Sequence, residues 1–214
     1  MEAPVNFKAM PFKKKIGYIW DYYKYPILGI LFAIITIIST IYSQLTAKEC
    51  LLKLIMVNGT VPIETAIFAE DFLESEGYDS NTQEVTATTI RLGLTEETYE
   101  QDYEAIQALF VRLTSETVDI MSASDEIFDQ YASEGFFINL NDLFTKEELN
   151  LYQDLIVYTT HYETGELYPC GFDLSDNTWI KEHIRYNTNC QFGILFNAPN
   201  MERTKSFFTY LLNY

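Results

Sequence analysis

Residues 26–44, PILGILFAIITIISTIYSQ, contain no charged side chain. As a helix this stretch is about 28 Å long at 1.5 Å per residue, close to the hydrocarbon thickness of a bilayer. A buried helix of a soluble protein is the alternative, but such a helix keeps one polar stripe. This stretch has only scattered Thr and Ser, whose hydroxyls can hydrogen-bond within their own helix. We therefore predict a transmembrane helix over residues 26–45, with the lipid bilayer as its partner.

The segment before this stretch is basic and aromatic. It carries five lysines against two acidic residues. Five aromatic residues accompany the lysines, namely Tyr18, Trp20, Tyr22, Tyr23 and Tyr25. Cytoplasmic flanks of membrane helices are rich in lysine and arginine, and amphipathic rings favour the headgroup level. We predict that residues 1–25 are a cytoplasmic and interfacial segment.

The residues after the stretch carry no signal for cleavage. A signal peptide has a shorter apolar region followed by a small-x-small site, which residues 43–48, SQLTAK, do not supply. Lys48 and Glu49 make the approach to Cys50 too charged for a lipid-attachment site. We expect an uncleaved signal anchor in the cell membrane, a tether at residues 46–49 and an extracytoplasmic domain over residues 50–214.

The expected exported part is strongly acidic. Of the 14 basic and 31 acidic residues in the chain, five and two lie in residues 1–44, which leaves a formal charge of −20 on the remaining 170 residues. Such a charge repels nucleic acid and anionic lipid, so we expect no nucleic-acid partner. Most of these acids are expected to be a solvated surface rather than a cation site.

The order of expected elements indicates one α/β domain with a mixed, mainly parallel sheet. The first half alternates strands and helices: a strand at 51–57, a helix at 62–76, a strand at 84–94, a helix at 95–114 facing the core through Tyr99, Tyr103, Ile106, Phe110 and Leu113, a strand at 118–122 and a helix to about 133. The second half contains a capping box at residues 145–148, a hairpin over 154–162 and 167–172, a strand at 190–196 and a closing helix at 201–212.

Two stretches resemble the extracellular solute-binding proteins of ABC importers. In residues 118–152, Asp119-Ile120-Met121 precedes a helix with Tyr131, a Gly135 exit and the segment INLNDL at 138–143. The second stretch is the strand 192–196 with NAPN at 197–200 and the helix that carries Phe207 and Phe208. Residues 15–24, KIGYIWDYYK, are similar to the juxtamembrane run of single-pass proteins of Gram-positive bacteria.

This resemblance implies a type 2 periplasmic-binding-protein-like fold. Family members have two lobes around a cleft, whereas this chain has about half their length and only about 40 residues between the strand at 154 and Cys190. The resemblance therefore implies a single lobe with the second reduced to a hairpin. A single lobe cannot close over a ligand, so it lacks the binding energy that a second wall supplies.

Ligands of parallel sheets collect beyond the carboxyl ends of the strands. The candidate ligand-binding residues at those ends are Asn58, Gly59, Ser122, Ser124, Asp125 and Glu126, with Tyr131 as an aromatic wall. A structural interpretation is also open, in which Ser124 caps a helix and the two acids favour its positive end.

Other chemistry has weak support in the sequence. His161, Cys170, Asp173, Asp176 and His183 lack metal-ligand spacing, so we expect no metal and no cofactor, and a helix cap at Asp176 or Asn177 instead. No nucleophile elbow or phosphate loop is present, and we expect no enzyme activity. A Cys170–Cys190 disulfide and two free thiols both remain open.

Two functions are compatible with these features. The first is a membrane-anchored binding module for a small solute. The second is a non-catalytic scaffold or accessory subunit that docks a membrane-protein partner. A concave pocket of polar and aromatic residues near Asn58 and Ser124 favours the first, and a flat apolar patch of more than a few hundred Å² at the same place favours the second. A carboxylate-dependent hydrolase is a third reading, and it requires two acids converging in one cleft.

Overall fold

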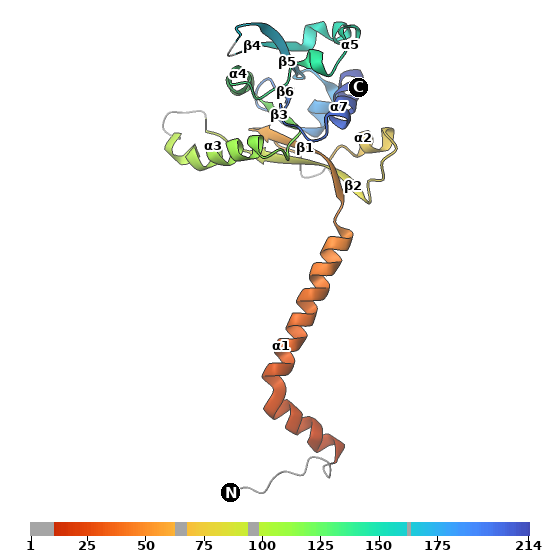
Figure 1. The fold of residues 1–214 in the computed structure, drawn as a ribbon. Coiled ribbons are helices and arrows are strands. Elements are labelled where there is room, and N and C mark those ends of the chain that lie inside the picture. Colours follow the sequence, from red (N-terminus) through yellow and green to blue (C-terminus); the bar gives the residue numbers. More distant parts are fainter. Residues whose placement is uncertain (1–10, 63–67, 94–98, 162–163) are drawn as a thin grey trace. The chain divides into compact units, whose positions relative to one another are not determined.

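The computed structural model describes residues 11–62, 68–93, 99–161 and 164–214, and it divides the chain into two compact units. The first unit, Met1–Ala47, contains the helix α1 (Phe12–Thr46). The second unit, Lys48–Tyr214, is an α/β domain built on a six-stranded sheet (Figure 1).

The apolar stretch predicted from the sequence lies in α1, which begins earlier than expected, at Phe12. Within the described residues, the part Tyr23–Thr46 is the one helix that is long and apolar enough to cross a membrane. Pro26 lies inside α1, where its ring removes a hydrogen bond and bends a helix, and α1 bends along its length in Figure 1. Thr36 and Thr40 donate to the carbonyls of Phe32 and Thr36, so these hydroxyls are satisfied within the helix, as predicted.

The sheet has the strand order β2-β1-β3-β6-β5-β4. The strands are β1 (Glu49–Val57), β2 (Gln83–Ile90), β3 (Ile120–Ala123), β4 (Ile156–Thr160), β5 (Leu167–Asp173) and β6 (Gln191–Ile194). Strand β1 pairs in parallel with β2 and β3, whereas the β3–β6, β6–β5 and β5–β4 pairings are antiparallel. The prediction of a mixed sheet is confirmed, but the prediction that it is mainly parallel is wrong. Among the described strands, only the β1–β2 and β1–β3 pairings are parallel, because the second half of the chain adds its strands as antiparallel neighbours.

Apolar residues face one another across the centre of the sheet. Leu54 of β1 is opposite Ile120 of β3, which is opposite Ile194 of β6, and each is at most 1% exposed. This register explains the nearly continuous apolar sequence of β1, because a central strand is covered on both faces. Lys53 is the exposed exception within its apolar run.

The helices of the first half differ from the prediction in extent and orientation. Helix α2 (Glu70–Ser75) is shorter than the expected 62–76, and Ala69 before it has a left-handed backbone with φ +57°. Residues 63–67 lie outside the described part of the chain. Helix α3 (Tyr99–Thr114) ends at the expected residue, and its expected start at residue 95 lies outside the described part of the chain. It faces the core through Leu109 and Leu113.

The remaining elements follow the prediction more closely. They are α4 (Asp125–Ser133), the 3-10 turns η2 (Leu140–Asp142) and η3 (Gln153–Leu155), α5 (Lys146–Leu151), α6 (Thr178–His183) and α7 (Met201–Asn213). The capping box of α5 is confirmed, since Thr145 Oγ1 accepts from the Glu148 N–H and Glu148 accepts from the Thr145 N–H. For α6, the sequence analysis predicted a helix cap at Asp176 or Asn177 but gave no range for the helix.

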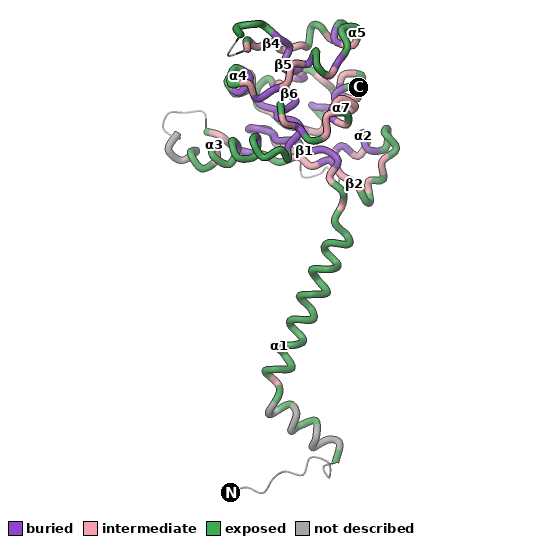
Figure 2. Tube along the Cα trace, in the orientation of Figure 1, coloured by how far each residue is buried: buried purple, intermediate pink, exposed green. Residues whose placement is uncertain are grey.

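An aromatic cluster joins α2, α6 and α7. Phe207 of α7 meets Phe72 of α2 edge to face at 4.9 Å, and Trp179 of α6 at 5.7 Å. All three are at most 1% exposed. Figure 2 shows buried segments concentrated along the central strands, whereas α3 is exposed over much of its described length.

Candidate functional site

The carboxyl end of β1 is occupied by hydrogen bonds within the protein. Asn58 has a left-handed backbone with φ +60°, and its N–H donates to the Ile90 carbonyl at 2.8 Å. Its side-chain Oδ1 accepts from the Leu92 N–H, also at 2.8 Å. Asn58 therefore ties the end of β1 to the end of β2, and its amide oxygen already has a partner.

Tyr186 fills the space beyond β1 and β3. Its hydroxyl lies 2.5 Å from Ser122 Oγ, and its ring lies directly over Gly59, where any Cβ would clash with it. Thr60 and Arg185 hold it there through a two-way backbone bridge with N···O distances of 3.0 and 2.8 Å. Burial raises the pKa of the Tyr186 phenol above its ordinary value, which the hydrogen bond to Ser122 partly offsets.

Because of this arrangement, three predicted ligand-binding residues contact the protein itself. Ser122 is fully buried and paired with Tyr186, and Gly59 lies beneath the same ring. Asn58, Gly59 and Ser122 therefore lie together as expected, but a side chain of the protein itself occupies the position where a solute was expected.

A polar depression lies beside the other predicted residues. It has a volume of about 420 Å³ and is lined by Ser124, Asp125, Glu126, Thr188 and Asn189. Asp125 Oδ2 accepts from the Asn189 amide at 3.3 Å, whereas the buried Oδ1 has no hydrogen-bond partner. Ser124 precedes α4 at the N-cap position, but its hydroxyl makes no capping hydrogen bond. The two acids lie in the first turn of α4, where the helix dipole favours negative charge.

Tyr131 lies in the core and forms no wall of this depression. It is 6% exposed and packs edge to face against Phe136 at 5.3 Å. Tyr131 lies about two turns into α4 after Ser124, on the side of the helix that also buries Ile127 and Phe128, so it points to the interior.

The buried carboxylate of Asp119 serves the fold. Asp119, 1% exposed, accepts from the Lys53 and Asn200 N–H groups at 2.9 Å each. Burial raises the pKa of the Asp119 carboxyl, and these hydrogen bonds oppose the shift. Asp119 thereby fastens the start of α7 to β1, a structural role for the aspartate that carried the family resemblance.

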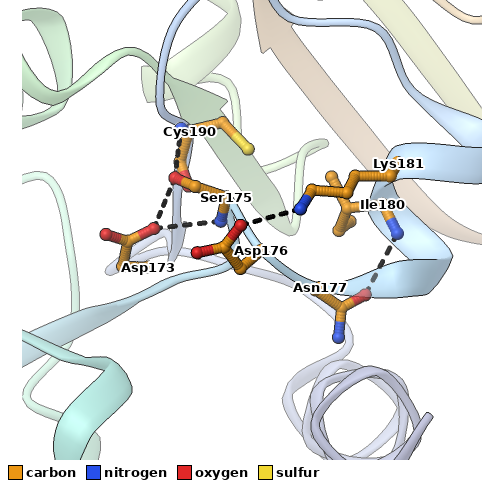
Figure 3. Close-up of polar contacts among 7 residues, drawn as sticks. All are labelled: Asp173, Ser175, Asp176, Asn177, Ile180, Lys181 and Cys190. Atoms are coloured by element: carbon orange, nitrogen blue, oxygen red, sulfur yellow. Dashed lines mark hydrogen bonds and ion pairs between the residues drawn. The ribbon is translucent and has the colours of Figure 1, made fainter.

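The residues considered for metal binding belong to separate structures. Asp173 accepts from the N–H and hydroxyl of Ser175, whose Oγ accepts from the Cys190 N–H, as Figure 3 shows. Asp176 forms an exposed ion pair with Lys181 at 2.7 Å. Within the described ranges, no three His, Cys, Asp or Glu side chains are grouped as metal ligands would be.

The same segment confirms a helix cap and answers the question about the cysteines. Asn177 Oδ1 accepts from the Ile180 N–H at 3.0 Å and so caps α6, as one of the two predicted positions (Figure 3). Cys170 and Cys190 are both buried free thiols, and Cys50 is a free thiol of intermediate exposure. Burial raises the pKa of Cys170 and of Cys190 to about 12.

An exposed aromatic row was missed by the sequence analysis. Phe110 of α3 meets Phe136 edge to face at 6.0 Å, and Phe136 meets Phe196 at 6.3 Å. Tyr103 lies two helical turns before Phe110, on the same side of α3. We call Tyr103, Phe110, Phe136 and Phe196 the aromatic row. Phe136 is buried, but Tyr103, Phe110 and Phe196 are 61%, 53% and 52% exposed.

The row corrects the predicted inner face of α3. Tyr103 and Phe110 were assigned to the core, together with Ile106 and Leu113. The helix instead turns Leu109 and Leu113 to the sheet, which leaves the two aromatic rings at the edge of the core. The signal that could have identified them is the width of the apolar stripe, which exceeds what one sheet face can cover.

Comparisons with protein-family models, curated proteins and solved structures found no match for this chain. The resemblance to solute-binding proteins therefore stays a prediction based on the two stretches quoted above.

Proposed function

We propose that this chain is a single-pass membrane protein whose residues 48–214 form a non-catalytic extracytoplasmic domain that docks a partner protein. The observation that carries this proposal is the aromatic row, in which three large rings are more than half exposed. Single exposed apolar residues are ordinary, but contiguous apolar surface on a soluble domain marks an interaction site. Aromatic residues are also the type most enriched at protein interfaces.

The site beyond β1 and β3 supports docking over solute binding. A one-lobed solute receptor would need this place open to solvent. Here Tyr186 fills it and takes the hydroxyl of Ser122 as its own partner. A ligand would have to displace the ring and break the bridge between Thr60 and Arg185.

The anchoring part of the proposal rests on α1. Its apolar section Tyr23–Thr46 follows a lysine-rich segment, which favours a cytoplasmic N-terminus. Cysteine labelling of the full chain in intact cells tests this orientation. In a variant with the three native cysteines replaced, a cysteine at exposed Glu182 should react with an impermeant maleimide, and one at Met10 should react only after lysis. The opposite pattern, or release of the chain by alkaline extraction of membranes, would contradict the anchor.

Site-specific photo-crosslinking of the full chain tests the docking function. A photoreactive residue is introduced separately at Phe110, Phe196, Leu151 and Tyr158, all exposed positions. Docking predicts that at least one position forms a discrete adduct on irradiation, with a protein identified by mass spectrometry. If none of the four forms an adduct while the chain is folded and membrane-bound, the docking proposal fails.

A second candidate, a solute-binding module, is favoured by the depression beside Ser124. The unpaired Asp125 Oδ1 and the amide of Asn189 offer hydrogen-bonding groups to a small polar solute. Thermal-shift screening of the full chain against sugars, amino acids, peptides and divalent cations tests it, since a ligand of the folded state raises the melting temperature. The shift should be lost in Asp125→Ala and kept in Asp176→Ala.

A further inference from the structure

We infer that the partner of the aromatic row is an amphipathic helix with a basic rim, supplied by another protein. This inference rests on the proposed docking function, and it adds the shape and charge of the occupant. The alternatives for the same surface are a second copy of this chain and the lipid headgroup layer.

The shape of the row fits one helix face. Tyr103 and Phe110 are separated by seven residues of α3, which correspond to about 10 Å along the helix axis. The ring of Phe136 lies 6.0 Å from that of Phe110, and the ring of Phe196 lies 6.3 Å from that of Phe136. Tyr103 and Phe110 are thus spaced as residues of one helix face are, and a partner helix laid along α3 would meet both rings.

The charges around the row call for a basic partner. Three exposed glutamates lie within a few residues of it in the sequence, Glu104 on α3, Glu116 after α3 and Glu134 before Phe136. Arg112 is the opposing charge on the described part of α3. The formal charge of −20 over residues 45–214 adds a long-range field of the same sign. A helix with lysine or arginine beside its apolar stripe would be attracted by this field.

The same charges disfavour the two alternatives. A second copy would carry the same formal charge of −20, and like charges brought together across an interface weaken it. Anionic headgroups would be repelled, whereas segments that bind such lipid surfaces are rich in lysine and arginine. A basic helix from a different protein is the occupant that satisfies both the apolar row and its rim.

A synthetic peptide tests the inference directly. The probe is a labelled helical peptide of about 15 residues with leucines along one face and lysines on both flanks. Its binding to the full chain in neutral-lipid nanodiscs is followed by fluorescence anisotropy at near-physiological salt. We expect saturable binding that weakens at least tenfold in Phe110→Ser and in Tyr103→Ser. Val111→Ser is the matched control, because Val111 is 63% exposed on the same helix but lies about 100° around it. It should change the affinity less than twofold.

Several results would overturn the inference. One is equal affinity of the lysine peptide for the wild type and Phe110→Ser, provided that the variant keeps its unfolding midpoint. Another is equal or tighter binding of a peptide with glutamates in place of the lysines. Self-association that Phe110→Ser abolishes would assign the surface to a second copy, and vesicle binding that it abolishes would assign the surface to lipid.

The crosslinking scan separates this inference from the docking function itself. Adducts from Leu151 or Tyr158 but not from Phe110 or Phe196 would leave a docking domain whose interface lies elsewhere. No adduct from any of the four positions would remove the docking function as well. An adduct from Phe110 to a segment without basic residues would confirm that the aromatic row is the docking surface. It would contradict the inference that the partner is basic.

Discussion

Asp71 Oδ2 accepts a hydrogen bond of 2.6 Å from the indole Nε1 of Trp179. The same oxygen accepts from the Tyr210 hydroxyl at 2.9 Å and lies 3.9 Å from His183 Nε2. One carboxylate therefore connects α2, α6 and α7 at the edge of the aromatic cluster. Burial, the hydrogen bond to Asp71 and the charge of Asp71 raise the pKa of Tyr210 above its ordinary value.

Removing this carboxylate should destabilise the domain. Asp71→Ala leaves the indole N–H of Trp179 and the hydroxyl of Tyr210 without their acceptor, at a cost of about 1–3 kcal/mol in the free energy of unfolding. Urea unfolding of the full chain in micelles, followed by tryptophan fluorescence, measures the loss. Asp176→Ala is the matched control, because the Asp176 side chain is fully exposed and the loss of its ion pair with Lys181 should not shift the midpoint. Equal effects of the two variants would contradict the role of Asp71.

The contact between Tyr186 and Ser122 should behave as one unit. Tyr186→Phe leaves a buried hydroxyl on Ser122 unpaired and should cost about 1–2 kcal/mol. Ser122→Ala leaves the phenol unpaired and should have a similar cost. The double variant should lose less than the sum of the two, because both partners are then absent. Additive losses in urea unfolding would show that the hydroxyls do not interact in solution.

Asp119 should make the stability depend on pH. Its raised pKa means that the folded state binds the proton more tightly than the unfolded chain does. The contribution of Asp119 to the free energy of unfolding is therefore largest below the ordinary aspartate pKa, and it decreases as pH rises from there through the raised folded value. Asp119→Asn removes this titration, so the stability advantage of wild type over the variant should shrink with rising pH across that window. An advantage that grows with pH would have the wrong sign.

The three cysteines should label at different rates. Cys170 and Cys190 are buried, with the pKa of each raised to about 12, so neither should react with iodoacetamide at mildly alkaline pH until the domain unfolds. Cys50 has intermediate exposure and should react first. Mass spectrometry of the full chain should find all three alkylated after unfolding without reductant. A pair protected even then would indicate a disulfide.

Local sequence chemistry predicted the elements that depend on near neighbours. The capping box at Thr145 and Glu148 and the cap at Asn177 are contacts across three residues, and both form as the residue types indicate. The strand β1 could likewise be predicted, because each apolar side chain in its run favours removal from water on its own account. These features need no knowledge of the rest of the chain.

The orientation of α3 could not be derived in this way. Tyr103, Phe110 and Leu113 share a stripe at helical spacing, and Leu109 lies at the side of that stripe. Hydrophobicity alone does not say which part of a wide stripe meets the sheet, because that depends on the space left by the neighbouring elements. Tyr103 and Phe110 are exposed because Leu109 and Leu113 are the part of the stripe that meets the sheet.

The grouping of three candidate residues could be predicted from the sequence, but the side chain that covers them could not. Strand order places Asn58 and Ser122 at neighbouring carboxyl ends. The ring above them comes from Tyr186, which is 64 residues away from Ser122 in the sequence. No local pattern connects these positions, so the sequence could not tell that the place was already filled.

The close approach of Tyr186 to Gly59 has a consequence for the history of the chain. Any side chain at position 59 meets the phenol ring, so Gly59 is replaced without a clash only after a smaller residue has arisen at position 186. In the reverse order, the Tyr186 ring has to move away from position 59 and from Ser122. Relatives should therefore have a large residue at position 59 or at position 186, but not at both. In a homologue with large residues at both positions, the backbone around position 186 should have a different conformation.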